Sequence, residues 1–395
     1  MNLAIFLNAK PLFYDVIDYD RFPKAYQSIQ CHLAVPKVIH LVGTNGKGST
    51  GRFLATALHR SGKKVGHYTS PHIIAFNERI WLDGHNVSDE VLEEAHQKLL
   101  ILLDGTVASQ LSYFEYTTLL AMIVFENCEY VVLEAGLGGE YDATNVFPKL
   151  LSIFTPIDFD HVSFLGSTIE EIASTKLRSM TAKALMGKQP HIETKIIART
   201  IASDKNCTLL CIDGMASDAI KEKALQIAIK NGLSEYLRDN LELAMAGFEV
   251  LGFDSTVELF DQEALFGRLT RVAPNVTLDV GHNTQAASQI AHHYGDQKIT
   301  LIYNTYADKD YAEILSILKP IIKTVEIINV DEGRIVPREK LETVLSDLGV
   351  SFATFGEICE DKEYLVFGSF SVAETFLKRA KETDSYALLD FNPIK

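Results

Sequence analysis

The sequence of 395 residues has little of what marks membrane, exported or nucleic-acid-binding proteins. No apolar run approaches the roughly 18 residues needed to cross a bilayer, and the apolar N-terminus has neither a basic front nor a cleavage site. Lys and Arg form no dense block, and the net charge is −15. We therefore expect no membrane span and no export signal. An acidic chain also argues against nucleic acid as the main partner.

Cysteine is scarce as well. The five residues, Cys31, Cys128, Cys207, Cys211 and Cys359, are odd in number and scattered along the chain. Cys207 and Cys211 are loosely spaced for a zinc pair, and no second pair accompanies them. Free thiols in a reducing compartment fit this pattern best, so we expect a cytoplasmic protein.

What the chain does have is ample apolar material. Hydrophobic residues make up 47% and charged residues 23% of the sequence, proportions typical of globular proteins with real cores. The length suggests two or three domains at about 100–200 residues each. There are no internal repeats and no low-complexity stretches.

The most informative stretch is residues 38–50, VIHLVGTNGKGST. An apolar run breaks into a glycine-rich loop that contains Lys47, and a helix is expected directly after it. In such a layout backbone N–H groups point at phosphate oxygens. Lys47 would reach the outer phosphates, and Ser49 or Thr50 would offer a hydroxyl to Mg²⁺. We interpret this stretch as an ATP-binding loop.

The alternative is a glycine-rich turn without a ligand. Gly43 and Gly46 are closer together than in the commonest phosphate-loop pattern, so the generic match is imperfect. A strand before the loop, a helix after it and a lysine within it favour nucleotide binding.

The first two thirds of the chain alternate between apolar strands and helices. Strands are expected at 64–69, 130–134 and 150–155, with helices at 51–60, 91–103 and 114–127. Strands that are nearly all apolar call for a parallel sheet covered on both faces. Ligands gather at the carboxyl ends of such strands, where Ser70, Glu134 and His161 lie.

Later segments are less regular and then turn into a second α/β unit. We expect a helical lead-in before residue 37, short strands at 195–198 and 207–212, and a helix at 240–251. In the second unit, strands are expected at 275–278, 299–303, 324–329 and 364–367, helices at 285–294, 311–318 and 338–348, and a tail from 383. The predicted fold class is α/β: a P-loop mononucleotide-binding domain with a largely parallel sheet over residues 1–258, and a smaller Rossmann-like domain over 259–395.

Nine segments together carry a family resemblance. In chain order they are HLVGTNGKGST, YTSPHIIAFNERIWLDGHNVSDE, FEYTTLLA, VVLEAGLGGEYDATNV, FDHVSFLGSTIEEIASTK, FGRL, LDVGHN, YADKD and FGS. In this order and spacing the chain resembles folylpolyglutamate synthase/dihydrofolate synthase of the bacterial bifunctional type, within the Mur ligase superfamily. The resemblance runs from the lead-in to about residue 371.

The resemblance implies an ATP-dependent ligase that adds L-glutamate to dihydropteroate and to the γ-carboxylate of tetrahydrofolate or its polyglutamates. An acyl phosphate formed from ATP would activate the acid. ATP and Mg²⁺, with two metal sites, are the implied cofactors. Dihydropteroate, reduced folates and glutamate are the implied partners, and a monomer is expected. The second domain would be the Mur ligase-type glutamate ligase domain.

The resemblance also implies roles for particular residues. ATP binding falls to Thr44, Asn45, Gly46, Lys47, Gly48, Ser49, Thr50, Asn240, Arg268 and Asp279. Metal binding falls to Ser70, Glu134, His161 and Lys176, the last carbamylated by CO₂, and the catalytic set is Lys47, Lys176 and His282. Substrate contacts are expected from Phe76, Arg79, Phe114, Glu115 and Asp308, with Trp81 and Tyr116 as further aromatic candidates for a pterin slot.

Physical chemistry supports some of these roles and offers ordinary alternatives to others. Glu134 ends an apolar strand, where a carboxylate is costly unless it meets a cation. His161 could be a core histidine, and imidazole prefers softer metals than Mg²⁺. Lys176 follows a capping box and could be a solvated helix lysine. The aromatic residues could be plain core.

Several positions depart from the family pattern. Leu177-Arg178-Ser179 stands where Ala-Gly-Ile is usual, and Glu140 stands where an arginine often follows the glycines. Tyr236-Leu237 replaces His-Gln ahead of Asn240, and Thr284 replaces a proline. These changes affect substrate details more than the type of reaction.

Three alternatives to a folate ligase stay open. A peptidoglycan Mur enzyme shares the loop but carries a domain of about 100 residues ahead of it, whereas 42 residues precede Gly43 here. A P-loop kinase or ATPase would not need Arg268, Asp279 and His282. A nucleotide-dependent binding module would have no use for the acidic and basic groups.

Overall fold

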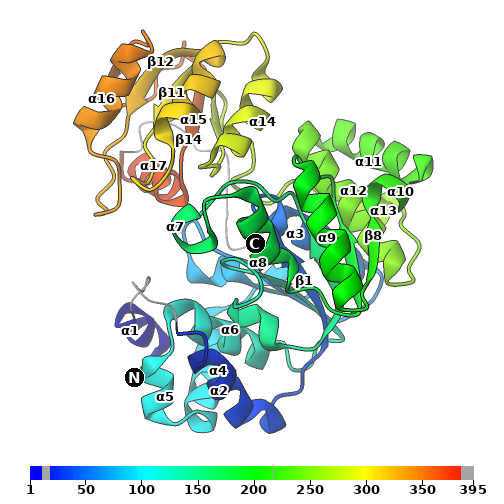
Figure 1. Cartoon of the computed structure of the whole chain (residues 1–395). Helices are drawn as coiled ribbons and strands as arrows, with labels where there is room; N and C mark the ends of the chain where they lie inside the picture. Colours follow the sequence, from blue (N-terminus) through cyan, green and yellow to red (C-terminus); the bar gives the residue numbers. More distant parts are fainter. Residues whose placement is uncertain (11–17, 216, 384–395) are drawn as a thin grey trace.

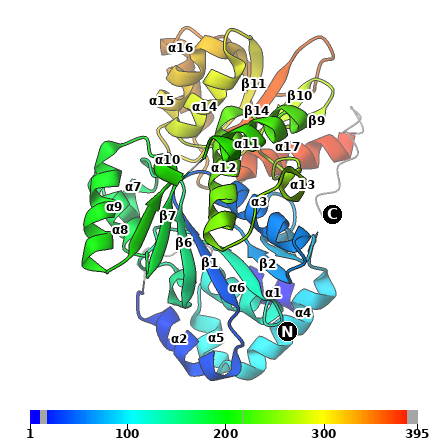
Figure 2. The same ribbon diagram turned by 90° about the vertical axis from the view of Figure 1, so that its right-hand side faces the viewer.

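The computed structural model describes residues 1–10, 18–215 and 217–383. Figures 1 and 2 show two lobes, a larger one coloured blue to green and a smaller one coloured yellow to red. Each lobe is built on its own sheet with helices on both faces. The predicted α/β fold class with two units is confirmed.

The larger lobe contains an eight-stranded sheet in the order β4-β3-β2-β5-β1-β6-β7-β8. The strands are β1 (Lys37–Val42), β2 (Val65–Tyr68), β3 (Ile80–Leu82), β4 (His85–Asn86), β5 (Tyr130–Glu134), β6 (Lys149–Phe154), β7 (Lys183–Met186) and β8 (Thr208–Cys211). All neighbours from β2 to β8 pair in parallel, whereas β3 and β4 add an antiparallel edge. The sheet is thus largely parallel, as predicted.

Alternate side chains of the central strands enter different cores, because successive strand residues point to opposite faces. Val131 and Leu133 of β5 pack on one side, while Val132 packs on the other. The first core contains α1 (Leu3–Asn8), α2 (Arg21–Ile29), α4 (Asp89–Leu102), α5 (Gly105–Gln110) and α6 (Tyr113–Val124). The second contains α3 (Lys47–Arg60), α11 (Asp218–Asn231), α12 (Glu235–Val250) and α13 (Val257–Phe260).

The remaining elements of this lobe flank β6 to β8 or form short turns. They are α7 (Val162–Leu165), α8 (Ile169–Leu177), α9 (Ile192–Asp204), α10 (Ile212–Met215), η1 (Gln30–His32), η2 (Phe76–Arg79) and η3 (Ala143–Val146). Thr168 and Glu171 form the predicted capping box at the start of α8. Among the described residues no helix is long and apolar enough to cross a membrane.

The smaller lobe contains a six-stranded sheet in the order β13-β12-β11-β14-β10-β9. Its elements are β9 (Thr270–Ala273), β10 (Val276–Leu278), α14 (Thr284–Tyr294), β11 (Ile299–Tyr303), α15 (Tyr311–Leu318), η4 (Lys319–Ile321), β12 (Ile322–Ile327), α16 (Arg338–Asp347), β13 (Phe352–Thr354), β14 (Tyr364–Phe367) and α17 (Phe370–Thr383). Only β9 pairs antiparallel; the other neighbours are parallel.

Most predicted elements are confirmed, but one predicted strand is wrong and several elements are missing from the prediction. The strand predicted at 195–198 is wrong, since these residues lie inside α9. Strands β7, β9 and β13 and helix α17 were not predicted. The tail expected from residue 383 lies almost wholly outside the described residues, and the domain boundary at 258/259 stays a prediction.

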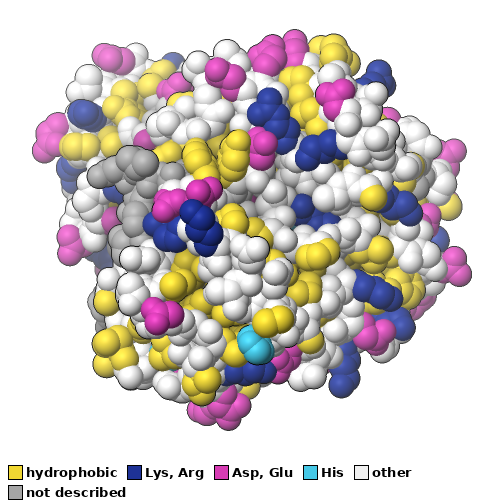
Figure 3. Space-filling model, turned by 60° about the horizontal axis from the view of Figure 1, so that its bottom comes forward, with side chains coloured by type: hydrophobic (Ala, Val, Ile, Leu, Met, Phe, Trp, Pro, Cys, Tyr) yellow, Lys and Arg dark blue, Asp and Glu magenta, His cyan; other side chains and the backbone are white. Residues whose placement is uncertain are grey.

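The distribution of charged side chains on the surface agrees with the absence of a dense basic block in the sequence. On the face in Figure 3, Lys and Arg side chains stand beside Asp and Glu rather than in one broad basic area. All five cysteines are described, and none forms a disulfide.

Candidate active site

The loop between β1 and α3 can be formed only with glycine at two positions. Gly46 has φ +87°, a conformation that costs other L-residues free energy. A Cβ on Gly46 would lie 2.4 Å from Oδ1 of Asn240, and a Cβ on Gly43 would lie 2.0 Å from Oγ1 of Thr155. The loop is therefore packed tightly against β6 and α12, with its N–H groups at the start of α3.

Lys47 is the first residue of α3 and turns back over the loop. Its Nζ donates to the carbonyl oxygens of Gly43 at 3.2 Å and Thr44 at 3.1 Å, and it lies 3.8 Å from Oε1 of Glu134. The hydroxyls of Ser49 and Thr50 are buried and have no hydrogen-bond partner among the described residues. Because buried hydroxyls are normally paired, this part of the loop fits phosphate oxygens and a hydrated Mg²⁺.

Glu134 ends β5 beside the loop. Its Oε2 accepts hydrogen bonds from the hydroxyl of Thr69 and from the backbone N–H of Ser70 at 3.2 Å. Ser70 thus meets Glu134 through its backbone, and Thr69, which the sequence analysis missed, is the side-chain partner. Thr69 stands directly before the predicted metal ligand, which is the one feature that could have indicated it.

His161 does not join this group. It has φ +51°, and its Nε2 lies 3.8 Å from Oδ2 of Asp160, although it lines the same cleft as Glu134. Burial lowers the pKa of His161 to about 4, against the raising effect of Asp160. In the described part of the chain no three His, Cys, Asp or Glu side chains converge as metal ligands. A metal at Glu134 would accordingly depend on hydroxyls, water and substrate oxygens, which suits Mg²⁺.

Lys176 is buried rather than solvated, with 3% of its surface exposed. It projects from α8, and its Nζ donates to the carbonyl oxygen of Gly43 at 2.9 Å. Burial, followed by the charge of Lys47, lowers the pKa of Lys176 to about 7. The solvated-lysine alternative is therefore wrong. A neutral amine beside a cation is a setting that an anionic carbamate would fit.

Two departures from the family pattern compensate each other. Glu140 and Arg178 form an ion pair, with Oε2 and Nη1 separated by 3.3 Å. Each residue supplies a charge that the usual pattern lacks at its position. The reversed charge at Glu140 is thus paired locally and is not directed at a bound anion.

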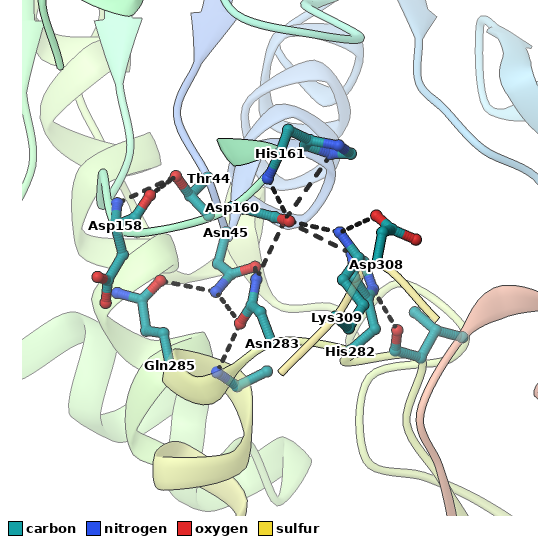
Figure 4. A network of polar contacts seen from close by, with 12 residues as sticks. Thr44, Asn45, Asp158, Asp160, His161, His282, Asn283, Gln285, Asp308 and Lys309 are labelled. Carbon is teal, nitrogen blue, oxygen red and sulfur yellow. Dashed lines mark hydrogen bonds and ion pairs between the residues drawn. The ribbon is translucent and has the colours of Figure 1, made fainter. Parts of the chain in front are cut away.

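A polar network joins the two lobes above the loop (Figure 4). Asp160 of the larger lobe accepts a hydrogen bond from Lys309 of the smaller lobe, and both side chains are buried. Oδ2 of Asp160 lies 3.4 Å from Nδ2 of Asn283 and 3.7 Å from Nε2 of His282. Burial alone would raise the pKa of Asp160, but the contact with His282 and the charges of His161, His282 and Lys309 hold it well below its usual range.

The loop itself also reaches the smaller lobe. Asn45 and Asn283 exchange two amide hydrogen bonds of 3.0 Å, and Asn45 donates a further one to Gln285 at 2.6 Å. Thr44 is tied to the backbone of Asp158. The phosphate loop is therefore part of the contact between lobes, which the sequence analysis did not foresee.

Asp279, one of the predicted ATP-binding residues, is already engaged by protein groups. Its carboxylate accepts from the hydroxyl of Tyr236 at 2.9 Å and from the N–H groups of Leu269 at 3.0 Å and Gly281 at 2.8 Å. Burial raises its pKa, and Arg268 opposes the shift. Tyr236, one of the departures, thus fills a place next to this carboxylate.

The substrate candidates fall into different settings. Arg79 donates to Nδ1 of His72 at 2.8 Å and lies over the ring of Tyr113. Glu115 is held by Arg21 through two hydrogen bonds of 2.9 and 3.1 Å, so its carboxylate is committed to a protein partner. Tyr116 is fully buried and belongs to the core.

These groups surround one interlobe cleft of about 630 Å³. Its lining includes the predicted residues Thr44, Asn45, Gly46, Lys47, Gly48, Ser49, Ser70, Arg79, Phe114, Glu115, Glu134, His161, Lys176, Asn240, Arg268, Asp279, His282 and Asp308. Thr50, Phe76 and Trp81 are not among its described lining residues. The cleft has a volume typical of ligand sites.

A phosphate loop on one α/β lobe, facing basic and polar groups on a second, defines a two-lobed ATP-dependent ligase. The described fold has a TM-score of 0.80 with the crystal structure of Helicobacter pylori folylpolyglutamate synthetase, at 40% identity over 96% of this chain and 98% of that one. Dihydrofolate synthase/folylpolyglutamate synthase of Escherichia coli is 30% identical over 308 residues, 73% of this chain and 71% of the relative. The chain belongs to the dihydrofolate synthase/folylpolyglutamate synthase family.

A more distant solved structure shares the fold. Folylpolyglutamate synthase of Mycobacterium tuberculosis complexed with ADP has a TM-score of 0.82 at 22% identity, covering 95% of this chain and 97% of that one. No protein-family model matches the chain.

Proposed function

We propose that this protein is an ATP- and Mg²⁺-dependent ligase that adds L-glutamate to 7,8-dihydropteroate and to the γ-carboxylate of tetrahydrofolate or its polyglutamates. The observation that carries this proposal is the interlobe cleft, in which Lys47 and Glu134 face His282 and Lys309 of the other lobe. The membership in the family supports the same substrates.

The reaction requires that a carboxylate become a better electrophile. A carboxylate oxygen attacks the γ-phosphorus of ATP, ADP leaves, and the acyl phosphate is then attacked by the glutamate amine with release of phosphate. Charge spreads over the transferring phosphoryl group, so positioned cations contribute most of the catalysis. Lys47, from the loop, and Arg268, from the smaller lobe, are the cations that we assign to this role.

Mg²⁺, when bound, would neutralise phosphate charge, and Glu134 with Ser49 and Thr50 is the set that fits it. His282 is the proposed acceptor for the amine proton. Its Nδ1–H donates to the carbonyl oxygen of Val280 at 3.1 Å, so Nε2 is the nitrogen that would take the proton. Nε2 lies 3.7 Å from Oδ2 of Asp160, whose charge would stabilise the protonated ring. Asn240 would contact adenine, and Asp308 would line the glutamate side.

The proposal is tested by measuring ADP release with ATP, Mg²⁺, glutamate and either dihydropteroate or tetrahydrofolate. We expect ADP only when glutamate and a pteroate are both present. ADP formation at the same rate without glutamate would instead support a kinase or a simple ATPase. The same assay with a UDP-sugar acid in place of the pteroate separates the peptidoglycan ligases.

Substitution Glu134→Gln should raise the Mg²⁺ concentration needed for half-maximal activity by about 10–100-fold, the loss that even outer partners of metal ligands cause. The amide keeps the volume and still accepts one hydrogen bond, but it loses the charge. Glu129→Gln, at an exposed position on the same lobe, is the control. An unchanged Mg²⁺ requirement would rule out a metal role for Glu134.

Lys176 is expected to form a carbamate that can be seen by ¹³C NMR with ¹³C-labelled bicarbonate. CO₂ reacts with the neutral amine, and since the pKa of Lys176 is lowered to about 7 from 10.5, the neutral form predominates above pH 7. The signal should grow between pH 6 and pH 8 and be absent in Lys176→Met. A spectrum with no carbamate signal at pH 8 would contradict this assignment.

We further propose that the protein acts as a cytoplasmic monomer. The free cysteines support the compartment. The cleft supports the monomer, because both of its walls come from one chain.

A further inference from the structure

A second, smaller cavity of about 430 Å³ lies next to the interlobe cleft. It is enclosed by α3, by the hairpin β3–β4 and by the connection between the lobes at residues 262–266. Arg52, His59 and Gln262, which line it, have none of the roles assigned above, whereas Trp81 was a candidate for the pterin slot. Its wall includes Arg52, His59 and Trp81.

Arg52 is the most unusual group in this smaller cavity. Its guanidinium lies over the ring of Trp81, 5.0 Å from the ring centre, and its Nε contacts Nδ1 of His67 at 3.2 Å. Among the described residues no carboxylate lies within ion-pair distance of it. Burial lowers the pKa of Arg52 to about 10. Arg52 is half-buried; a partly desolvated charge without a counter-ion is costly, and an anion in the cavity would offset that cost.

A second donor lines the smaller cavity without an acceptor. Nε2 of Gln262 is buried and has no hydrogen-bond partner in the described part of the chain. The nearby carboxylate of Glu78 is occupied, because it accepts from the N–H groups of Ile73, Ile74 and Ala75 at 2.8 Å each. The lining of the smaller cavity contains three arginines, Arg52, Arg60 and Arg268, and two carboxylates, Glu78 and Glu263, so its charge favours an anion.

The two cavities adjoin each other. Ser70, Pro71, Arg268 and Phe370 line both of them. The guanidinium of Arg268 lies 5.5 Å from the centre of the Phe370 ring, so these two side chains stand where the cavities meet. Ser70 also contacts Glu134, which places the entrance of the smaller cavity beside the phosphate-transfer end of the cleft.

We propose that the smaller cavity binds an α-carboxylate of the γ-glutamyl tail of a polyglutamylated folate, held by Arg52 and Gln262. The inference rests on the proposed function. Each γ-glutamyl residue carries one free α-carboxylate, and a guanidinium pairs with a carboxylate through two parallel hydrogen bonds. A short γ-glutamyl tail that leaves the interlobe cleft beside Ser70 and Arg268 would meet Arg52 and Gln262 in the adjoining smaller cavity. Dihydropteroate has no tail and does not use the site.

The test compares KM for tri-γ-glutamyl tetrahydrofolate with KM for dihydropteroate. Arg52→Gln removes the charge, and Gln262→Glu places a competing carboxylate in the cavity without touching α3. Both should raise KM for the tri-γ-glutamyl substrate by about tenfold or more, the value of one charge-assisted hydrogen bond, and leave KM for dihydropteroate and ATP unchanged. Arg199→Gln and Gln297→Glu, at exposed positions, are the matched controls.

An unchanged KM for the tri-γ-glutamyl substrate in Gln262→Glu and Arg52→Gln would overturn the proposal. So would an equal rise for dihydropteroate, which would indicate a structural role for Arg52. Calorimetry with free tri-γ-glutamate separates this proposal from the function itself. If the wild type releases no glutamate-dependent ADP, the function fails, but tri-γ-glutamate should still bind and binding should be lost in Arg52→Gln. Equal binding of inorganic phosphate would show an unselective anion site and also overturn the proposal.

Discussion

Replacement of Lys47 by alanine is expected to lower the rate of ATP-dependent glutamate ligation by about 10²–10³-fold, the usual effect of removing one preorganised electrostatic contact to a transition state. Lys47 is anchored on the loop by the carbonyl oxygens of Gly43 and Thr44 and lies 3.8 Å from Glu134. It is therefore already placed where phosphate charge would develop. The measurement is initial ADP release with dihydropteroate and glutamate.

The variant should remain folded, because alanine is well accepted in the first turn of a helix and Lys47 makes no core contact. Lys64→Ala, at an exposed position of the same lobe, is the control and should keep full activity. Retained turnover in Lys47→Ala, with a normal thermal unfolding curve, would refute the assignment of the phosphate loop.

The second large effect is expected at the buried ion pair between the lobes. Lys309→Met would leave Asp160 without its closest cation, and breaking a buried pair from one side costs about 3–5 kcal/mol. Since a displacement of about 1 Å between reacting groups can lower a rate about 10²-fold, kcat/KM for glutamate should fall by about two orders of magnitude. The substitution weakens the contact between the two lobes, to which this pair and the Asn45–Asn283 hydrogen bonds contribute.

The double variant Asp160→Asn, Lys309→Met distinguishes an unpaired charge from a lost contact. It has no uncompensated buried charge, so part of the loss should be recovered relative to Lys309→Met alone. Lys319→Met, an exposed change in the same lobe, is the control. If the single variant keeps kcat/KM for glutamate within about threefold of the wild type, the pair does not hold the catalytic arrangement.

The sheet strands could be predicted where burial on both faces leaves a continuous apolar run. β5 is the clearest case, because all five of its residues are buried. The phosphate loop could be predicted for a different reason: only glycine tolerates the φ of Gly46 and the close approach of Asn240. In both cases the residues of the segment itself are enough to predict its structure.

The strand predicted at 195–198 is wrong because not all of the apolar residues in this region are buried. The apolar residues Ile192 and Ile196 are 62% and 56% exposed, while Thr194, Ala198 and Ala202, spaced four apart, form the buried face of α9. The small side chains at helical spacing pack against α8, so this segment forms a helix although its isoleucines favour a strand. The missed strand β9 is stabilised by antiparallel pairing with β10. The sequence of residues 270–273 alone does not predict this pairing.

The candidate site divides in the same way. Residues within a motif, such as Lys47 and Glu134, could be found from the sequence. The pairing of Asp160 with Lys309 joins residues 149 positions apart, and it depends on how the lobes meet. The arrangement of Arg52, which has no carboxylate partner among the described residues, beside the unpaired amide of Gln262 is likewise visible only once the lobe connection is placed against α3.

The cleft is expected to transfer phosphate to the pteroate carboxylate before glutamate attacks. The direct measurement uses dihydropteroate labelled with ¹⁸O in its carboxylate, with ATP, Mg²⁺ and glutamate, and mass analysis of the released phosphate. We predict one ¹⁸O atom in each phosphate formed from fully labelled substrate. Phosphate without ¹⁸O, released at the same rate as the folate product, would contradict the account.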